Sequence, residues 1–447
     1  MEFLDNLVLP QSAEHIELLH YMLSLVLILF IPFISIVFGG LILSVYYKRK
    51  GLKNSDNNSL NYAKDVIQFV TVNNGVGVIL GIVPLLTAIL IFAQLLHTAQ
   101  VSTVGYLALS FLFVTVGLIM TYVYRHSFVI SQIFSSVDKS NISDQNAITE
   151  VEKLKSSTQT LAVKNGKWAV LFLFIGIWLF IGAITTAANF SIFNVTGVLQ
   201  LLFSYKVIIN LLIFISFAFV LTGSAALFGF LYWKENLQIT EEYRNFLRTA
   251  SAKTALYFAV PLPFLIALNL FSIPASFLSG AVFFYGITAL LLIFLGWHFI
   301  YMILQYKKYN YSAHLFFTII FAVFALIIKD QVAITNATAT HSIVLSTQFD
   351  EILSELRGAG GIAEISGKEL YEVRCASCHQ FEQKLVGPPH KDVLPKYIGK
   401  ESQLVAFIRN PVKIDPAYPP MPNPGLKPQE AEAVVKYIFE AYKDKLQ

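Results

Sequence analysis

Charged residues are scarce in this chain of 447 residues: they make up 13 % of the sequence, whereas hydrophobic residues make up 55 %. Because a typical soluble domain carries roughly 25 % charged residues, this composition predicts a membrane protein with a smaller soluble part. The formal net charge of +4 is too small to indicate nucleic-acid binding. Only two cysteines occur, Cys375 and Cys378, so the chain has no framework of several disulfides.

Asp and Glu are nearly absent from eight long apolar runs, which argues against a proton path of buried carboxylates. Each run is long enough to cross about 30 Å of hydrocarbon as a helix. We therefore predict an all-α fold, a polytopic helix bundle of about eight spans over residues 19–332 that follows a tail of residues 1–18. The runs cover about 19–47, 75–97, 104–128, 168–190, 205–232, 254–275, 280–304 and 312–332.

The stretch 375–379, Cys-Ala-Ser-Cys-His, has the spacing of a covalent haem attachment site. Each thiol can bond one vinyl group of a haem, and His379 can turn its imidazole onto the iron. One alternative is a thioredoxin-like redox pair, which would accompany a strand-helix-strand pattern that this sequence lacks. Another is zinc, which would require two more Cys or His ligands nearby. The motif predicts one covalent c-type haem with His379 as an axial ligand.

Residues 362–447 around this motif resemble a class I c-type cytochrome. A helix predicted at 366–378 carries the motif, and Gly387-Pro388-Pro389 follows where that family has a proline carbonyl that accepts the Nδ1 proton of the ligand histidine. The resemblance gives Pro388 this role. Further helices are predicted at 403–410 and 429–442, and we expect the last one to pack near Tyr371.

Met421 is the expected sixth ligand of the iron. It is the only methionine in residues 362–447, and it lies in Tyr418-Pro419-Pro420-Met421-Pro422, where the flanking prolines stiffen the chain. His390 is the competing ligand, but it follows Pro388 so closely that we place it on the side of His379. An iron with His and Met ligands has no vacant position for a substrate, so we predict an electron carrier.

Basic residues are sorted between the connections of the eight runs. The connections 98–103, 191–205 and 276–280 contain no Lys or Arg, whereas those after the first, third, fifth and seventh runs are basic. For a bacterial cytoplasmic membrane, the positive-inside rule places the basic connections in the cytoplasm and both termini in the periplasm. This agrees with covalent haem attachment outside that membrane. Residues 333–361 are predicted to be a periplasmic tether, and residues 135–164 a solvated cytoplasmic loop.

Histidine within a span is rare enough to suggest a function, and five histidines lie at the ends of predicted spans. His20 and His97 fall near the outer face, and His126, His298 and His314 near the inner face. Two such layers would suit two b-type haems stacked across the membrane. The alternative is that they are interfacial residues, like Tyr or Trp.

The first two spans resemble subunit I of the cytochrome bd quinol oxidases. His20 at the outer end of the first span and Asn73-x-x-x-Gly77-Val78-x-x-Gly81 in the second match that family. Leu85 stands where a carboxylate is expected, and the Gly-Arg-Gln-Pro-Trp signature is missing, so the resemblance does not imply oxygen reduction.

Together these features predict a membrane-bound electron-transfer protein in contact with the lipid bilayer and with respiratory or redox subunits. It would relay electrons between the quinol pool, or a membrane redox complex, and a periplasmic acceptor or donor. Two alternatives remain: a docking or redox-sensing subunit of a larger respiratory complex, and a terminal oxidase subunit of the bd type.

Overall fold

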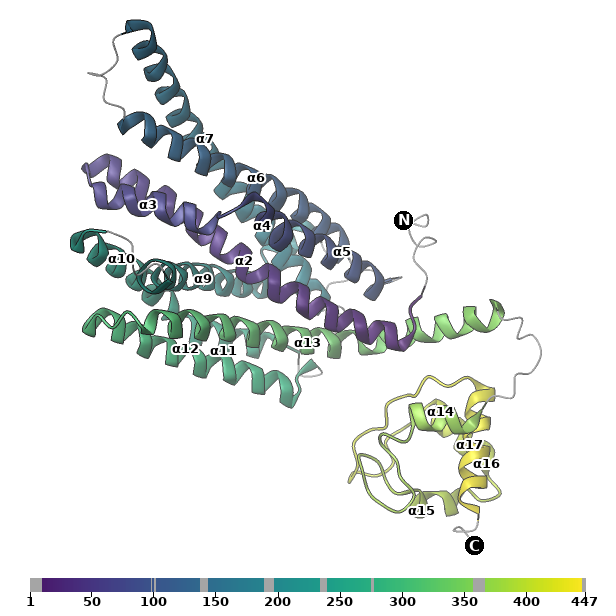
Figure 1. Ribbon diagram of the computed structural model, residues 1–447. Coiled ribbons are helices and arrows are strands. Elements are labelled where there is room, and N and C mark those ends of the chain that lie inside the picture. The colour runs from purple at the N-terminus through teal and green to yellow at the C-terminus, as the bar shows by residue number, and fades with distance from the viewer. Residues whose placement is uncertain are drawn as a thin grey trace. The chain divides into compact units, whose positions relative to one another are not determined.

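The computed structural model describes residues 10–97, 99, 102–136, 144–188, 197–233, 239–274, 277–356 and 366–443. These residues form helices and connecting segments, with no strand among them (Figure 1). They divide into two compact units, of which the first comprises mainly residues 14–342 and the second mainly the residues from Ile343 onward. We call them the membrane unit and the C-terminal unit.

Eight helical segments of the described chain are long and apolar enough to span a membrane, which confirms the predicted all-α bundle. Near the start of α2, His20 Nδ1 lies 3.3 Å from Oγ1 of Thr335 on α13, so both helices reach the same end of the membrane unit, as an even number of spans requires (Figure 1). The spans are α2 (Ala13–Asn54), α4 to α5 (Asn74–Leu95), α6 (Thr103–Ser136), α7 (Gln145–Ala188), α9 with its π-helical end (Tyr205–Trp233), α10 to α11 (Glu241–Ser272), α12 (Gly280–Tyr306) and α13 (Tyr311–Leu356).

Several helices extend beyond the apolar runs. Residues 13–18 of the predicted tail belong to α2, and residues 333–356 of the predicted tether belong to α13; residues 357–361 of that tether lie outside the described residues. The predicted solvated loop at 135–164 is wrong for residues 145–164, because α7 is helical from Gln145, while residues 137–143 lie outside the described residues. Hydropathy marks only the part of a helix that crosses the hydrocarbon, while backbone hydrogen bonds continue the same helix into water.

Helix α3 (Asn57–Val70) lies in the connection after the first span, for which the sequence predicted basic residues but no helix. Asp56 caps it, since its side chain accepts hydrogen bonds from the backbone N–H groups of Asn58 and Ser59 at 3.0 and 3.2 Å. The helix is amphipathic, and its buried Tyr62 pairs its hydroxyl with that of Ser251 on α10 (Glu241–Ala259) at 2.9 Å. This contact fixes α3 against the spans.

Two prolines within spans coincide with breaks in regular α-helix, whereas Pro32 lies inside the continuous helix α2. A π-helical turn, η1 (Val78–Ile82), precedes Pro84, and Pro261 separates α10 from α11 (Leu262–Ser272). Proline lacks the N–H that the regular helix would use, so the backbone changes its hydrogen-bond pattern there.

Close contact between spans depends on small residues. A Cβ atom at Gly39 of α2 would lie 2.5 Å from the carbonyl oxygen of Ala218 on α9 (Tyr205–Leu227). At Gly176 of α7 it would lie 2.9 Å from the backbone nitrogen of Val114 on α6. Such close approach of backbones is typical of helix packing in lipid, where dispersion contacts replace the hydrophobic effect.

The C-terminal unit contains short helices around a small core. They are α14 (Gly367–Arg374), α15 (His390–Val393), η5 (Leu394–Tyr397), α16 (Glu401–Arg409) and α17 (Pro428–Ala441). Helices α14, α16 and α17 correspond to the three predicted helices. The rings of Tyr371 and Tyr437 lie 5.6 Å apart, as expected for the packing of α14 on α17, and a Cβ atom at Gly367 would collide with the carbonyl oxygen of Ala433.

Candidate functional site

Cys375, Cys378 and His379 lie in the turn that comes directly after the end of α14. After Arg374 ends the helix, the N–H of Cys375 donates to the carbonyl of Tyr371 at 2.9 Å, and the N–H groups of Cys378 and His379 donate to the carbonyl of Cys375 at 3.1 and 3.0 Å. Both cysteines are free thiols, and Cys375 is 8 % exposed. One turn of backbone therefore presents both thiols and the imidazole together.

The imidazole of His379 has a defined orientation. Its Nδ1 lies 3.1 Å from the carbonyl oxygen of Pro388, which can only accept, so Nδ1 carries the proton and Nε2 keeps its lone pair. Gly387 allows this approach: a Cβ atom there would lie 2.8 Å from both ring nitrogens. A metal ligand needs this tautomer, and the carbonyl also raises the donor strength of the ring.

Tyr371 and His390 support His379 from behind. The Tyr371 hydroxyl donates to the carbonyl of His379 at 3.2 Å and lies 2.9 Å from Nε2 of His390. The His390 ring stacks on that of His379 at 5.3 Å between centroids and an interplanar angle of 16°. His390 is thus on the side of His379, as the sequence suggested. The hydrogen-bonding role of Tyr371 was not foreseen, because the sequence indicated only a packing residue.

Burial shifts the pKa values of Cys375 and His390. It raises the pKa of the Cys375 thiol to about 11, with a further contribution from Cys378. Burial, together with the neighbouring His379, lowers the pKa of His390 to about 4. At neutral pH the stacked pair therefore carries no charge on His390, and Cys375 is a thiol.

Met421 lies in the segment between α16 and α17, which has no regular secondary structure. The methionine is half-buried, and the segment is anchored beyond it by the buried Leu426. Lys427 is the N-cap of α17, and its backbone N–H donates to Glu430 Oε2 at 2.8 Å. The segment thus has a fixed end close to Met421, whose role as sixth ligand stays a prediction.

The histidines of the membrane unit occupy two kinds of position. His20 Nδ1 lies 3.3 Å from Thr335 Oγ1, and the buried His97 accepts a hydrogen bond at its carbonyl from Nε2 of His341 at 2.9 Å. His341 was not singled out from the sequence, because α13 continues past the apolar run.

The three histidines predicted near the inner face, His126, His298 and His314, are exposed on the surface of the membrane unit. The rings of His298 and His314 lie 5.9 and 5.7 Å from that of Phe299. Within the described part of the chain, no group of three or more His, Cys, Asp or Glu side chains could hold a metal ion. A ligand role for these histidines stays a prediction.

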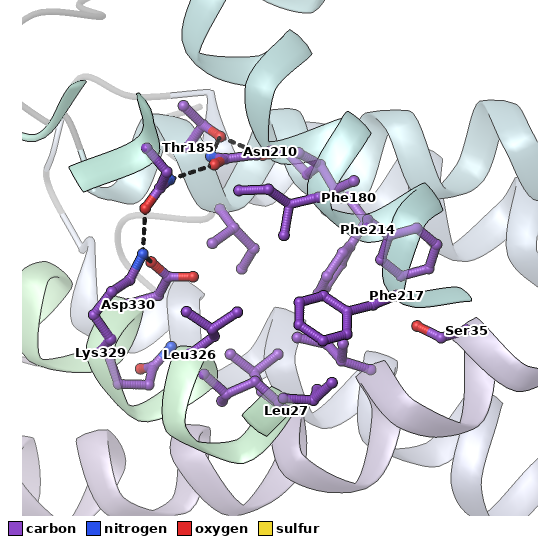
Figure 2. A pocket seen from close by; sticks show the side chains of 18 residues that line it. Leu27, Ser35, Phe180, Thr185, Asn210, Phe214, Phe217, Leu326, Lys329 and Asp330 are labelled. Atoms are coloured by element: carbon purple, nitrogen blue, oxygen red, sulfur yellow. Dashed lines mark hydrogen bonds and ion pairs between the residues drawn. The ribbon is translucent and has the colours of Figure 1, made fainter. Parts of the chain in front are cut away.

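A polar ladder in the membrane unit was missed by sequence reasoning. It consists of four side chains, each hydrogen-bonded to the next, from four different helices (Figure 2). In order they are Thr185 of α7, Asn210 of α9, Asn269 of α11 and Lys329 of α13. The signal available in the sequence was Asn or Lys inside an otherwise apolar run. Which of these residues meet depends on the helix packing.

Comparison with known proteins concerns the C-terminal unit. The family model for cytochrome c matches residues 365–441. Cytochrome c-551 of Pseudomonas denitrificans is 36 % identical over 78 residues, which are 16 % of this chain and 94 % of that protein. The relative from Ectopseudomonas mendocina is 35 % identical over 79 residues, 17 % of this chain and 95 % of that protein. The protein of the same name from Azotobacter vinelandii is 32 % identical over 78 residues, again 17 % and 95 %. No solved structure matches the chain.

The residues of the site fit a covalent haem. The turn offers two free thiols for vinyl groups, and the proton on Nδ1 of His379 leaves Nε2 available for iron. Together with the relatives, this donor set shows that the unit binds a c-type haem and transfers electrons. The family model does not extend to the first two spans, so their likeness to cytochrome bd subunit I stays a hypothesis. Through residues 365–441, this chain belongs to the cytochrome c family.

Proposed function

We propose that this protein relays electrons between the quinol pool, or a membrane redox complex, and a partner in the periplasm. The observation that carries the proposal is the His379 imidazole, which Pro388 holds in the ligand tautomer, on a chain with eight candidate spans. A single span would tether a cytochrome. The additional spans therefore have another task, and contact with a lipid-soluble electron donor is the task that suits their location.

The residues of the C-terminal unit have distinct roles in this proposal. Cys375 and Cys378 attach the haem, which supplies a one-electron iron couple when bound. His379 and Met421 would both bind the iron and would thereby leave no position for a substrate. Tyr371 and Pro388 keep His379 in place through its carbonyl and its Nδ1 atom.

The arrangement of basic residues supports the periplasmic location. Lys and Arg are concentrated in four connections and absent from the three others, and an even number of spans returns α13 to the side on which α2 starts. Protease added to intact spheroplasts should release a haem-containing C-terminal fragment. Release only after lysis would contradict this location.

Quinol oxidation is tested with the full-length protein in proteoliposomes. Added duroquinol should reduce the c haem, seen as growth of its α-band absorbance, and a pyridine haemochrome spectrum should show protohaem beside haem c if the histidine layers bind b haems. A haem that ascorbate reduces and duroquinol does not would contradict the quinol link.

A docking or redox-sensing subunit is the second candidate. It is favoured by the exposure of His126, His298 and His314, because ligands of an enclosed haem would point into the bundle. In that case the purified protein contains haem c alone, and duroquinol reduces it neither in isolation nor in its native complex.

A further inference from the structure

One lysine is buried within the eighth span, where a charged side chain is costly. Lys329 is 2 % exposed, and its ammonium donates to Oδ1 of Asn269 and pairs with Oδ1 of Asp330 at 2.8 Å. The carboxylate of Asp330 compensates the positive charge. The pair is therefore neutral as a whole and offers hydrogen bonds rather than a net charge.

From Lys329 the polar ladder crosses the bundle. Asn269 donates from Nδ2 to Oδ1 of Asn210 at 2.6 Å, and Asn210 donates from Nδ2 to the Thr185 hydroxyl at 3.1 Å (Figure 2). The Thr185 hydroxyl in turn donates to the carbonyl of Ile181 at 2.7 Å. This chain of bonds fixes the direction of each amide and holds Lys329 at one end.

The ladder forms one wall of a cavity of about 110 Å³. An engineered cavity of roughly 150 Å³ binds benzene, so a ring enters this smaller space only if the side chains that line it move apart. Apolar and aromatic side chains line the rest of it, among them Leu27, Phe180, Phe214, Phe217 and Leu326 (Figure 2). A cavity with apolar walls and a few polar groups at one end is typical of a small-molecule site.

Two buried polar side chains lining the cavity lack hydrogen-bond partners among the described residues. Gln331 is 4 % exposed, and neither its Nε2 nor its Oε1 is bonded; the hydroxyl of the fully buried Ser35 is also unbonded. An unsatisfied buried amide is unfavourable and calls for a partner. Because the amide has both a donor and an acceptor, it suits a carbonyl oxygen and a hydroxyl equally.

A second, smaller cavity also borders the ladder. It shares Thr185, Asn210, Asn269 and Asp330 with the first cavity, and its further lining includes Lys206 and Pro274. Pro274 follows the end of α11, and Lys206 lies in the first turn of α9. Polar groups thus continue from the first cavity toward the ends of these helices.

We propose that the first cavity binds the ring of a quinone or quinol, with one ring oxygen at Gln331 and Lys329. The neutral Lys329–Asp330 pair favours an uncharged ligand over an anionic lipid headgroup, and the aromatic walls favour a planar ring. Quinones meet these requirements, because they are planar, uncharged and lipid-soluble, and their oxygens accept hydrogen bonds or, in the quinol, donate them. This inference rests on the proposed quinol link and assigns it a binding site.

The test uses the full-length holoprotein in nanodiscs free of quinone, with decylubiquinone as the probe. Binding is followed by quenching of tryptophan fluorescence, since Trp178 is two residues from the cavity-lining Phe180. Gln331→Leu should weaken binding about tenfold, the ratio that corresponds to ~1.4 kcal/mol. Gln94→Leu is the matched control. Gln94 lies on α5 (Val83–Leu95), and its Oε1 is 3.1 Å from Nε2 of His15 on α2. This substitution should change the affinity for decylubiquinone less than about twofold.

Ser35→Met is a second variant, in case Gln331→Leu does not fold. The longer side chain should fill part of the cavity and weaken binding without removing an existing hydrogen bond, because the Ser35 hydroxyl has none among the described residues. The haem spectrum and a monodisperse elution profile verify folding.

Equal binding by the wild type and both variants, or no binding by the wild type, would overturn the site. Reduction of the c haem by duroquinol is measured separately. If reduction occurs and the variants bind normally, the proposed function stands and this site is wrong. If the variants bind weakly but duroquinol never reduces the haem, the site stands and the quinol link is wrong.

Discussion

In the C-terminal unit, the groups that hold the cofactor are close neighbours along the chain. Cys375, Cys378 and His379 share one turn, and Pro388 follows nine residues later to fix the imidazole. In the membrane unit, the polar ladder draws one residue from each of four helices, ending at Lys329. The first site can form wherever its short segment folds, whereas the second requires the helices to have packed.

The two units also differ in the interactions that stabilise each of them internally. Covalent attachment of the haem depends on a few atoms of the C-terminal unit, so single substitutions there should have large effects. Hydrogen bonds between membrane helices contribute only about 0.6 kcal/mol each on average. Single changes in the ladder should therefore cause small losses spread over many contacts.

Loss of either thiol should have the largest effect. Cys375→Ala or Cys378→Ala removes one of two thioether bonds and should weaken or abolish stable haem attachment, and it can cost the fold of the small unit. Haem staining after denaturing electrophoresis measures this. Ser377→Ala, an exposed position between the two, is the control and should retain full staining. Normal staining of a cysteine variant would contradict covalent attachment at that residue.

Next in size is loss of the proposed sixth ligand. Met421→Ala should lower the reduction potential of the haem by ~59 mV or more, the shift equal to a tenfold change in the one-electron equilibrium. It should also abolish the sulfur-to-iron absorption near the red edge of the spectrum. Met302→Leu in α12 is the control. An unchanged band in the Met421 variant would refute the ligand assignment.

A smaller effect is expected from crowding the ligand histidine. Gly387→Ala places a Cβ atom 2.8 Å from Nδ1 of His379, so the ring or the loop must shift, at a cost of about 1–3 kcal/mol. Guanidinium unfolding followed by the haem absorbance of the full-length protein measures the loss. Gly280→Ala, where an added Cβ meets nothing within 4 Å, should leave the unfolding midpoint in place. Equal midpoints for both variants would show that the loop relaxes freely.

The smallest effect should come from the ladder. Thr185→Val removes the acceptor of Asn210 with almost no change in volume and should lower stability by about 0.6 kcal/mol. Thermal unfolding in nanodiscs measures this loss. In Thr87→Val the lost hydroxyl bonds only within its own helix, to Val83 at 2.9 Å, so the difference between the variants isolates the interhelical bond. A loss as large as that of Gly387→Ala would remove the contrast between the two units.

The sequence predicted the eight spans and the three main helices of the C-terminal unit because hydropathy and proline position are local signals. It predicted the contact between Pro388 and His379 by resemblance alone. It missed α3, whose cap at Asp56 lies in a basic connection, and it ended α13 too early, because a helix that leaves the hydrocarbon loses its apolar pattern while keeping its hydrogen bonds.

By itself, then, the sequence determined that the protein spans a membrane and carries one c-type haem, since both properties depend on residues adjacent along the chain. Only the tertiary structure decided that Tyr371 supports His379 and that Asn210, Asn269 and Lys329 meet beside an apolar cavity. The reason is physical: a span records how apolar it is, but the neighbour it faces is selected by the packing of all the helices at once.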